Sequence, residues 1–259
     1  MKLFDTHAHI GLIQDDQMSQ LLAVQMAKIK GVTHVVSITN SLADFEKTYD
    51  NLKSNDSVLH AVGVSPTEVI NPGQNWEERV MTNAKRDRVV AIGETGLDYH
   101  HYAHAKTQQI ELMLKHLDIA RILEKPVIIH NRDAKEDLLP ILIEKLPPKG
   151  GILHCYGEDW TFARKVLDLD LYFSFAGNLT FKHNRNLHEV AYRLPLDRIL
   201  IESEAPFMTP HRYKGERNKI HYLIETLYTI AEIRDTAVED VAEVIYDNSF
   251  RAFALEQES

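Results

Sequence analysis

Short apolar runs rich in β-branched residues recur along the chain, and amphipathic segments separate them. Most runs are almost continuously apolar, as in Val-Val-Ser-Ile and Pro-Val-Ile-Ile, which is typical of strands buried on both faces of a parallel sheet. The pattern predicts eight strands, at residues 2–6, 34–39, 58–64, 89–93, 127–130, 151–154, 171–174 and 198–201.

The segments between these runs carry apolar residues at spacings of three and four, which indicates amphipathic helices. Ser41 and Asp44 resemble a capping box at the start of one helix. Pro140 predicts a kink or an early end in another. The expected helices are 15–30, 41–55, 107–123, 133–146, 159–167, 183–192, 217–232 and 236–255.

Eight strands alternating with helices over 259 residues have the rhythm of a (β/α)8 barrel, whose usual length is about 250 residues. The main alternative is a doubly wound open sheet. A nucleotide-binding open sheet usually has a glycine-rich phosphate loop after its first strand, and this chain has none there. No interior linker divides the chain, so we expect one barrel domain over residues 1–259.

Composition narrows the class of protein. Hydrophobic residues make up 44% of the chain and charged residues 26%, which is ordinary for a globular protein. The single cysteine excludes a disulfide scaffold or a cysteine-rich zinc module and is typical of a reducing compartment. No apolar run approaches the roughly 20 residues of a membrane span, and the N-terminus does not resemble a signal peptide. We therefore expect a cytoplasmic protein that does not enter a membrane.

Residues able to bind metal fall at the carboxyl ends of the predicted strands, where barrel enzymes build their active sites. They are His7, His9, Glu94, His130, His154, Glu202 and Glu204. In an extended His-x-His segment both imidazoles lie on one face, so His7 and His9 could bind one cation. His130 and His154 could hold a second, and Glu94 could bridge the two.

The other histidines, among 14 in all, do not form such a pattern. We expect surface or satisfied polar positions for His34, His60, His116, His183, His188 and His221. A further cluster either touches substrate or forms a solvated loop, and it consists of His100, His101 and His104. Cys155 is expected to be a small core residue.

Six motifs in order, from residue 5 to about 250, resemble the TatD family of metal-dependent deoxyribonucleases. They are Asp-Thr-His-Ala-His, Gly-Glu-Thr-Gly-Leu-Asp-Tyr, Ile-His-Asn-Arg-Asp-Ala, His-Cys-Tyr, Phe-Ser-Phe-Ala-Gly-Asn-Leu-Thr-Phe-Lys and Glu-Ser-Glu-Ala-Pro. The resemblance implies a (β/α)8 barrel, a cytoplasmic enzyme and a centre of two divalent cations (Mg²⁺, Mn²⁺ or Zn²⁺). It also implies hydrolysis of phosphodiester bonds in DNA, in the manner of a 3′–5′ exonuclease.

The resemblance also implies roles for individual residues. His7 and His9 correspond to ligands of the first metal, His130 and His154 to ligands of the second, and Glu94 to the bridging carboxylate. Glu204 falls on the family aspartate that binds metal and handles the proton of the attacking water, so Glu94 and Glu204 are the expected catalytic carboxylates.

The chain departs from the family pattern at two places. Glutamate at position 204 is longer than aspartate by one C–C bond, about 1.5 Å, which could displace a metal or the general base. In the third strand, Ser65 and Thr67 stand where the family often has two histidines in Gly-x-His-Pro-His. This second departure predicts different handling of the substrate.

A phosphodiester substrate needs local positive charge, because the formal net charge is −9. The 211–219 segment has four basic residues against one acid and an aromatic residue for stacking on a base. We expect Arg212, Lys214 and Arg217 from this segment to bind substrate, together with Arg132, whose planar fork suits phosphate.

Three functions remain open from the sequence. The first is a metal-dependent nuclease or phosphodiesterase that acts on DNA with a metal-activated water. The second is an amidohydrolase acting on an amide, ester or lactone, although many such barrels bridge their metals with a carboxylated lysine and this chain has Glu94 there. The third is a metal-binding barrel that has lost turnover, which Glu204, Ser65 and Thr67 motivate. We expect a monomer.

Overall fold

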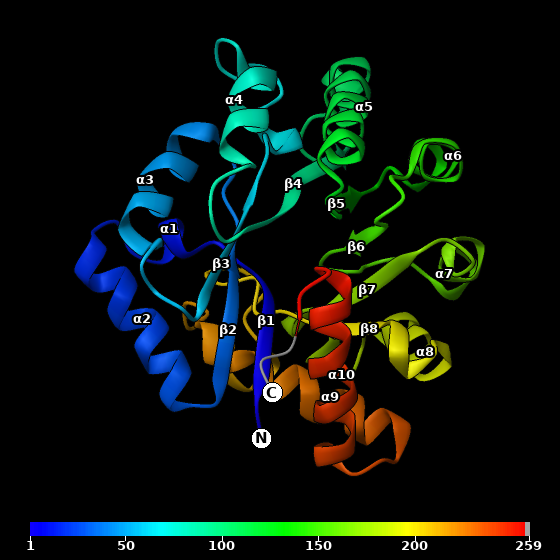
Figure 1. Ribbon diagram of the computed structural model, residues 1–259. Coiled ribbons are helices and arrows are strands. Elements are labelled where there is room, and N and C mark those ends of the chain that lie inside the picture. Colours follow the sequence, from blue (N-terminus) through cyan, green and yellow to red (C-terminus); the bar gives the residue numbers. More distant parts are fainter. Residues whose placement is uncertain (257–259) are drawn as a thin grey trace.

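The computed structural model describes residues 1–256 and contains eight parallel strands, hydrogen-bonded to one another in chain order (Figure 1). Near-continuous apolar stretches form these strands, as expected for a sheet covered on both faces. The strands are β1 Leu3–Ala8, β2 Val32–Ser37, β3 Val58–Val62, β4 Val89–Asp98, β5 Val127–Arg132, β6 Gly151–Leu153, β7 Leu171–Phe175 and β8 Ile199–Ile201.

The last strand returns to the first, which curls the sheet into a barrel. Beyond the end of β8, the Glu204 N–H donates to the His7 carbonyl over 2.9 Å, and the His9 N–H donates to the Ala205 carbonyl over 2.8 Å. The Thr6 hydroxyl donates to the Ile201 carbonyl over 3.0 Å. The predicted (β/α)8 barrel is confirmed.

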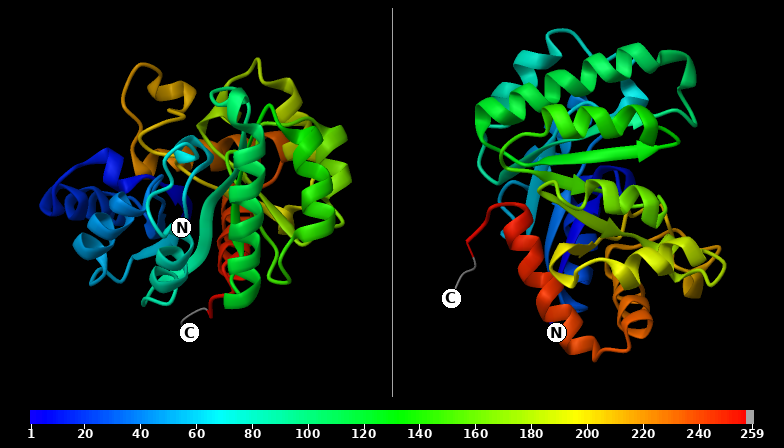
Figure 2. Two further views of the ribbon diagram at one scale, coloured as in Figure 1. Left: turned by 90° about the horizontal axis from the view of Figure 1, so that it is seen from above. Right: turned by 90° about the vertical axis from the view of Figure 1, so that its right-hand side faces the viewer.

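Helices connect successive strands and surround the barrel (Figure 2). The α-helices are α1 Ile10–Ile13, α2 Gln17–Ile29, α3 Leu42–Leu52, α4 Trp76–Asn83, α5 Lys106–Leu123, α6 Lys135–Lys145, α7 Trp160–Val166, α8 Arg185–Arg193, α9 Ile224–Arg234 and α10 Val238–Ala252. Short 3₁₀ turns are η1 Pro66–Glu68, η2 Ala103–Ala105, η3 Gly177–Thr180, η4 Leu196–Arg198, η5 His211–Tyr213 and η6 Ile220–Leu223. None of the helices among residues 1–256 has the length and apolar character needed to cross a membrane.

Apolar side chains fill the barrel and close one of its ends. Alternate strand residues such as Phe4, Val36 and Ile128 form an inner cluster, as the two-residue period of a strand requires. At the amino end of β1, the Phe4 ring stacks on Phe253 at 5.8 Å and meets the edge of Phe250 at 5.5 Å. These aromatic side chains fill the amino end of the barrel. The polar site lies at the opposite, carboxyl end of the strands.

Several predicted strand ends were wrong, and the errors matter for the site. β4 runs to Asp98 rather than ending at residue 93, so Glu94 lies inside a strand. Its pairing with β5 shifts register between Ile92 and Thr95. His7 likewise lies within β1 and His130 within β5. Polar residues continue these strands because parallel neighbours supply their backbone partners.

The helix predictions also need correction. Helix α4 was missed, because its eight residues Trp-Glu-Glu-Arg-Val-Met-Thr-Asn are mostly polar. Pro140 does not end α6, which continues to Lys145. The helix expected at 217–232 begins at residue 224, after a separate turn. Residues 217–219 therefore belong to a loop beside the site.

Candidate metal centre

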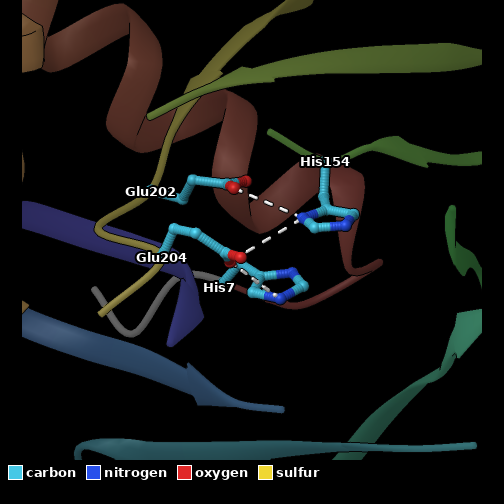
Figure 3. A group of neighbouring side chains, drawn as sticks. All are labelled: His7, His154, Glu202 and Glu204. Carbon is cyan, nitrogen blue, oxygen red and sulfur yellow. Dashed lines mark hydrogen bonds and ion pairs between the residues drawn. The ribbon is translucent and has the colours of Figure 1, made fainter. Parts of the chain in front are cut away.

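The residues expected to bind metal gather at the carboxyl end of the barrel. His7 comes from β1, Glu94 from β4 and His130 from β5, whereas His154 and Glu204 follow β6 and β8. Figure 3 shows His7, His154, Glu202 and Glu204 pointing toward one another, with both glutamates on the segment after β8. Apart from the partly exposed His130, all of them are buried, with His7 completely so. The spatial arrangement expected from the strand ends is therefore present.

Glu94 lies between two pairs of imidazoles. Its Oε2 atom is 3.8 Å from His7 Nε2 and 4.0 Å from His9 Nε2. Its Oε1 atom is 2.9 Å from His130 Nδ1 and 3.3 Å from His154 Nε2. Each oxygen of one carboxylate thus faces a different pair, which is the arrangement that a bridging carboxylate requires.

Within each pair the ring nitrogens converge. His7 Nε2 and His9 Nε2 are 3.3 Å apart, and His130 Nδ1 and His154 Nε2 are 3.0 Å apart. Nitrogens that each lie about 2.0–2.1 Å from one tetrahedral cation are separated by about 3.3 Å. The spacing of both pairs therefore fits a shared cation.

The backbone of β4 explains how Glu94 reaches this position. Gly96 has φ +134°, and a Cβ atom there would lie 2.1 Å from the His130 carbonyl oxygen. Only glycine permits β4 to run this close to β5. The Gly-Glu-Thr-Gly sequence thus allows Glu94 and His130 to project side by side from neighbouring strands.

Glu204 reaches the cluster from the loop after β8. Its Oε2 atom is 3.1 Å from His7 Nε2, 3.7 Å from His9 Nε2 and 3.9 Å from His154 Nδ1. The residue has φ +55°, and its N–H is bonded to the His7 carbonyl. The glutamate side chain therefore contacts both imidazole pairs.

Two further carboxylates lie behind the histidines. Asp98 Oδ2 is 3.3 Å from His130 Nε2, and Glu202 Oε1 is 3.4 Å from His154 Nδ1. Glu202 also accepts the Cys155 N–H over 2.9 Å. Metal-binding histidines commonly present their second nitrogen to a carboxylate, which fixes the ring. His154 does so through a hydrogen bond with Glu202, whereas His130 Nε2 lies within ion-pair distance of Asp98 and has no hydrogen bond with the residues that the structure describes. Asp98 was missed from the sequence because Gly-Leu-Asp-Tyr looked like a turn.

Asp5 is a second residue that the sequence analysis did not assign. Its Oδ1 atom accepts the Ser203 N–H over 2.8 Å and the His7 N–H over 3.2 Å. Complete burial raises the pKa of this carboxyl to about 8, against the lowering effect of the bonds from Ser203 and His7. Asp5 thereby ties His7 to the segment that carries Glu204.

The cluster is strongly coupled electrostatically. Burial opposes ionisation of Glu94, but His154 and His130 outweigh it and hold the pKa of Glu94 well below its usual range. Burial also opposes a charge on His154, yet Glu94 and Glu202 raise its pKa well above the usual value. For His7, burial and the neighbouring His154 and His9 lower the pKa strongly. Such a site favours positive charge beside Glu94, whether from protons or from a cation that displaces them.

The donor set suits a divalent cation. Three groups bring their ligand atoms within 4.8 Å of one another: His7 with His9 and Glu94, Glu94 with His130 and His154, and His7 with His154, Glu202 and Glu204. Among residues 1–256, the buried Glu204 Oε2 has no hydrogen-bond donor. Imidazole and carboxylate ligands together fit Zn²⁺, Mn²⁺ and similar ions.

The residues expected to bind substrate differ in whether they already have a partner within the protein. Arg132 is exposed at the end of β5. Arg212 Nη1 pairs with Glu225 Oε1 at 3.1 Å, and Arg217 donates to the Leu12 carbonyl. Lys214 is exposed, and no ion pair is found for it within the described part of the chain. Arg132 and Lys214 are therefore freer to meet an anion than Arg212.

The 211–219 segment is attached to the cluster by one buried residue. The Asn218 side chain, 2% exposed, donates to the carbonyls of Ser203 and Phe207. Phe207 is 48% exposed, and its ring centroid is 5.8 Å from that of His9. The sequence analysis did not single out this aromatic side chain, which lies at the open mouth of the site.

The remaining candidates either make contacts within their own turn or lie beside the carboxylates behind the site. Ser65 is buried and accepts the Thr67 N–H and hydroxyl within a turn. His101 Nδ1 lies 2.9 Å from Asp98 Oδ2, so this member of the 100–104 cluster touches the residues behind the site. Cys155 is half-buried beside Glu202 rather than in the core. Burial and the carboxylates Glu204, Glu202 and Glu94 raise the pKa of its thiol strongly, so it stays protonated.

Comparison with known proteins gives a consistent result. The family model described as "TatD related DNase" matches residues 4–254. YabD of Bacillus subtilis strain 168, named as an uncharacterized metal-dependent hydrolase, is 34% identical over 254 residues, covering 98% of this chain and 99% of YabD. YcfH of Escherichia coli K12, named in the same way, is 34% identical over 259 residues, covering 99% and 97%. The crystal structure of YJJV, a TatD homologue of E. coli K12, has a TM-score of 0.92 at 22% identity, with 98% of each chain covered.

Proposed function

Because the chain belongs to the family of TatD-related DNases and is a metal-dependent hydrolase, we propose that it cleaves phosphodiester bonds of DNA, as a 3′–5′ exonuclease. The observation that carries the proposal is the position of Glu94, whose two oxygens face two separate imidazole pairs. A pair of cations about 3.5–4 Å apart is the arrangement that many phosphatases and nucleases use for in-line displacement.

The residues at the site have distinct roles in this proposal. His7 and His9 would hold one cation and His130 and His154 the other, and Glu94 would offer one carboxylate oxygen to each pair. Divalent cations held there supply Lewis acidity and make water a stronger acid. Glu204 accepts the proton of the attacking water, because its Oε2 is buried without a donor and lies 3.1 Å from His7.

Positive and aromatic groups at the mouth support a nucleic-acid substrate. Arg132 and Lys214 are exposed and attract the phosphate backbone, and Arg217 is exposed three residues after Lys214 in the chain. Phe207 offers an exposed ring next to His9, and an aromatic ring can stack on any base. A charged backbone and a flat base are the two features of DNA that such a surface recognises.

The contacts of Glu204 favour an active enzyme over a barrel that only binds metal. The longer side chain still places its oxygen 3.1–3.9 Å from three of the histidine nitrogens. The loop after β8 that carries Glu204 is hydrogen-bonded to β1 through the Glu204 N–H and the His7 carbonyl, which holds the side chain in this position. We therefore expect turnover in the wild-type protein without restoring aspartate.

The test is a substrate panel with Mg²⁺ or Mn²⁺. We expect stepwise shortening of a 5′-labelled single-stranded DNA from its 3′ end and no shortening in EDTA. Glu94→Gln measures the background from contaminating nucleases. Hydrolysis of an amide or lactone with intact DNA would contradict the proposal. Labelled fragments produced by internal cuts alone, without stepwise shortening from the 3′ end, would also contradict it.

A further inference from the structure

Helix α2 exposes an apolar stripe on the side that faces away from the barrel. Its core face is formed by Gln20, Val24 and Ala27. At 100° per residue, the opposite face carries Met18, Leu22, Met26 and Ile29, which are 75%, 60%, 43% and 65% exposed. Twelve large apolar side chains are exposed among the described residues, and these four share one helix. A surface helix normally places polar residues there.

The stripe is accessible and almost free of charge. Figures 1 and 2 show α2 at the outer edge of the molecule, with no other element outside it. Lys28 is the single charged residue of the thirteen in Gln17–Ile29. A partner could therefore cover the stripe without removing a charge from water at its centre, a removal that would be costly.

The order of residues makes the stripe complementary to itself. In an antiparallel pair of α2 helices related by a twofold axis, Met18 meets Ile29 of the other copy and Leu22 meets Met26. Each contact occurs twice, as an isologous interface requires. The stripe spans about 16 Å along the helix, which allows the two copies to share three turns.

The charges at the helix ends favour the same antiparallel arrangement. Asp15 and Asp16 precede α2, and Lys28 and Lys30 lie at its end. Asp15 is ion-paired with Lys47 of its own chain at 2.6 Å, so Asp16 supplies the uncompensated negative charge at this end. In the antiparallel pair this end of each copy lies beside the basic end of the other. A parallel pair would place like charges together, which is unfavourable.

We propose that the stripe of α2 is the interface of a homodimer, in which two copies pack antiparallel through Met18, Leu22, Met26 and Ile29. The proposed dimer differs from the monomer expected from the sequence. Its interface does not include the residues of the metal centre. A membrane surface is a poorer partner, because membrane-bound helices are rich in Lys and Arg and this one has a single lysine. One helix pair buries area at the low end of specific interfaces, so the dissociation constant should be on the order of micromolar.

Sedimentation equilibrium of the full-length protein across 1–100 µM (roughly bracketing that constant) tests the proposal. The wild-type protein should form a concentration-dependent dimer. Leu22→Glu should weaken dimerisation by at least about 100-fold, because it buries an unpaired charge, while far-UV circular dichroism stays unchanged. Ile143→Glu, at an equally exposed position on α6 (62%), is the matched control and should still dimerise.

A charge exchange tests the antiparallel arrangement itself. In the antiparallel pair, Asp15→Lys places a cation beside Lys30 of the other copy, and Lys30→Glu places an anion beside Asp15 of the other copy. Each variant alone should therefore dimerise less well than their mixture. The mixture should form heterodimers, because opposite charges then face each other at both ends. A wild-type monomer at 100 µM, a dimer unaffected by Leu22→Glu, or no gain on mixing would overturn the proposal. Flotation with anionic lipid vesicles that Leu22→Glu abolishes would assign the stripe to a membrane and would also overturn it.

Discussion

Two regions of the barrel bury histidines, and they use them in opposite ways. At the carboxyl end of the strands, four imidazoles and Glu94 converge and their nitrogens face one another. Between the barrel and its outer helices, His60 and His116 are equally buried but lie apart. His116 accepts the Val64 N–H over 3.0 Å and donates to the Leu112 carbonyl over 2.8 Å. His60 packs against the Tyr49 ring at 4.9 Å.

The difference in neighbours produces a difference in charge. In the outer region, burial lowers the pKa of both His60 and His116 to about 4, so both rings are neutral near pH 7. At the metal centre, carboxylates counter the burial and raise the pKa of His9, His130 and His154, whereas burial and the neighbouring imidazoles lower the pKa of His7. Burial alone therefore does not identify a functional histidine, whereas convergence on a shared carboxylate does.

The largest expected effect comes from removing that shared carboxylate. Glu94→Gln keeps the size of the side chain but removes the charge that both imidazole pairs face. We expect loss of bound metal and a fall in kcat of more than about 10³-fold, equivalent to roughly 4 kcal/mol. Metal content by mass spectrometry and steady-state kinetics check this. Glu46→Gln, in a partly exposed ion pair with Arg79, should retain both properties.

The outer histidines predict a change in stability with pH. His116 has a pKa of about 4 when folded and 6.5 as its ordinary value, so the unfolded chain takes up a proton first as the pH falls. Neutral His116 contributes fully to the free energy of unfolding above pH 6.5. This contribution, about 3 kcal/mol, is lost as the pH falls from 6.5 to 4. Urea denaturation of the metal-free protein should therefore show a weaker pH dependence in His116→Gln.

The control for that experiment is a substitution on the surface that removes no titratable group. Gln108→Ala changes an exposed residue that does not titrate and should leave the pH dependence of unfolding as in the wild type. An identical slope for His116→Gln and the wild type between pH 6.5 and 4 would contradict the role assigned to His116.

A smaller effect is expected from the carboxylates behind the histidines. Asp98→Asn removes the charge 3.3 Å from His130 Nε2 and leaves the ring less firmly held. Metal affinity should fall by about 10–100-fold, measured by competition with a chelating dye. Asp118→Asn, in an exposed ion pair with Arg121, is the matched control. An unchanged affinity in Asp98→Asn would show that His130 needs no such support.

The barrel could be predicted from the sequence, and so could the convergence of the candidate ligands at one end of it, because apolar runs and strand ends have regular spacing. The sequence could not predict that β4 continues past Glu94, since Gly96 is needed for close approach to the His130 backbone. Nor could it assign Asp98, whose role depends on the pairing of β4 with β5. The ion pair of Arg212 with Glu225 likewise depends on how the loop folds back onto α9.

The central claim is that one carboxylate shared by two imidazole pairs holds two cations. Anomalous diffraction from a crystal soaked in Mn²⁺ tests it most directly. We predict two peaks about 3.5–4 Å apart with Glu94 between them, one beside His7 and His9 and the other beside His130 and His154. A single peak, or two peaks that do not share Glu94, would contradict the account.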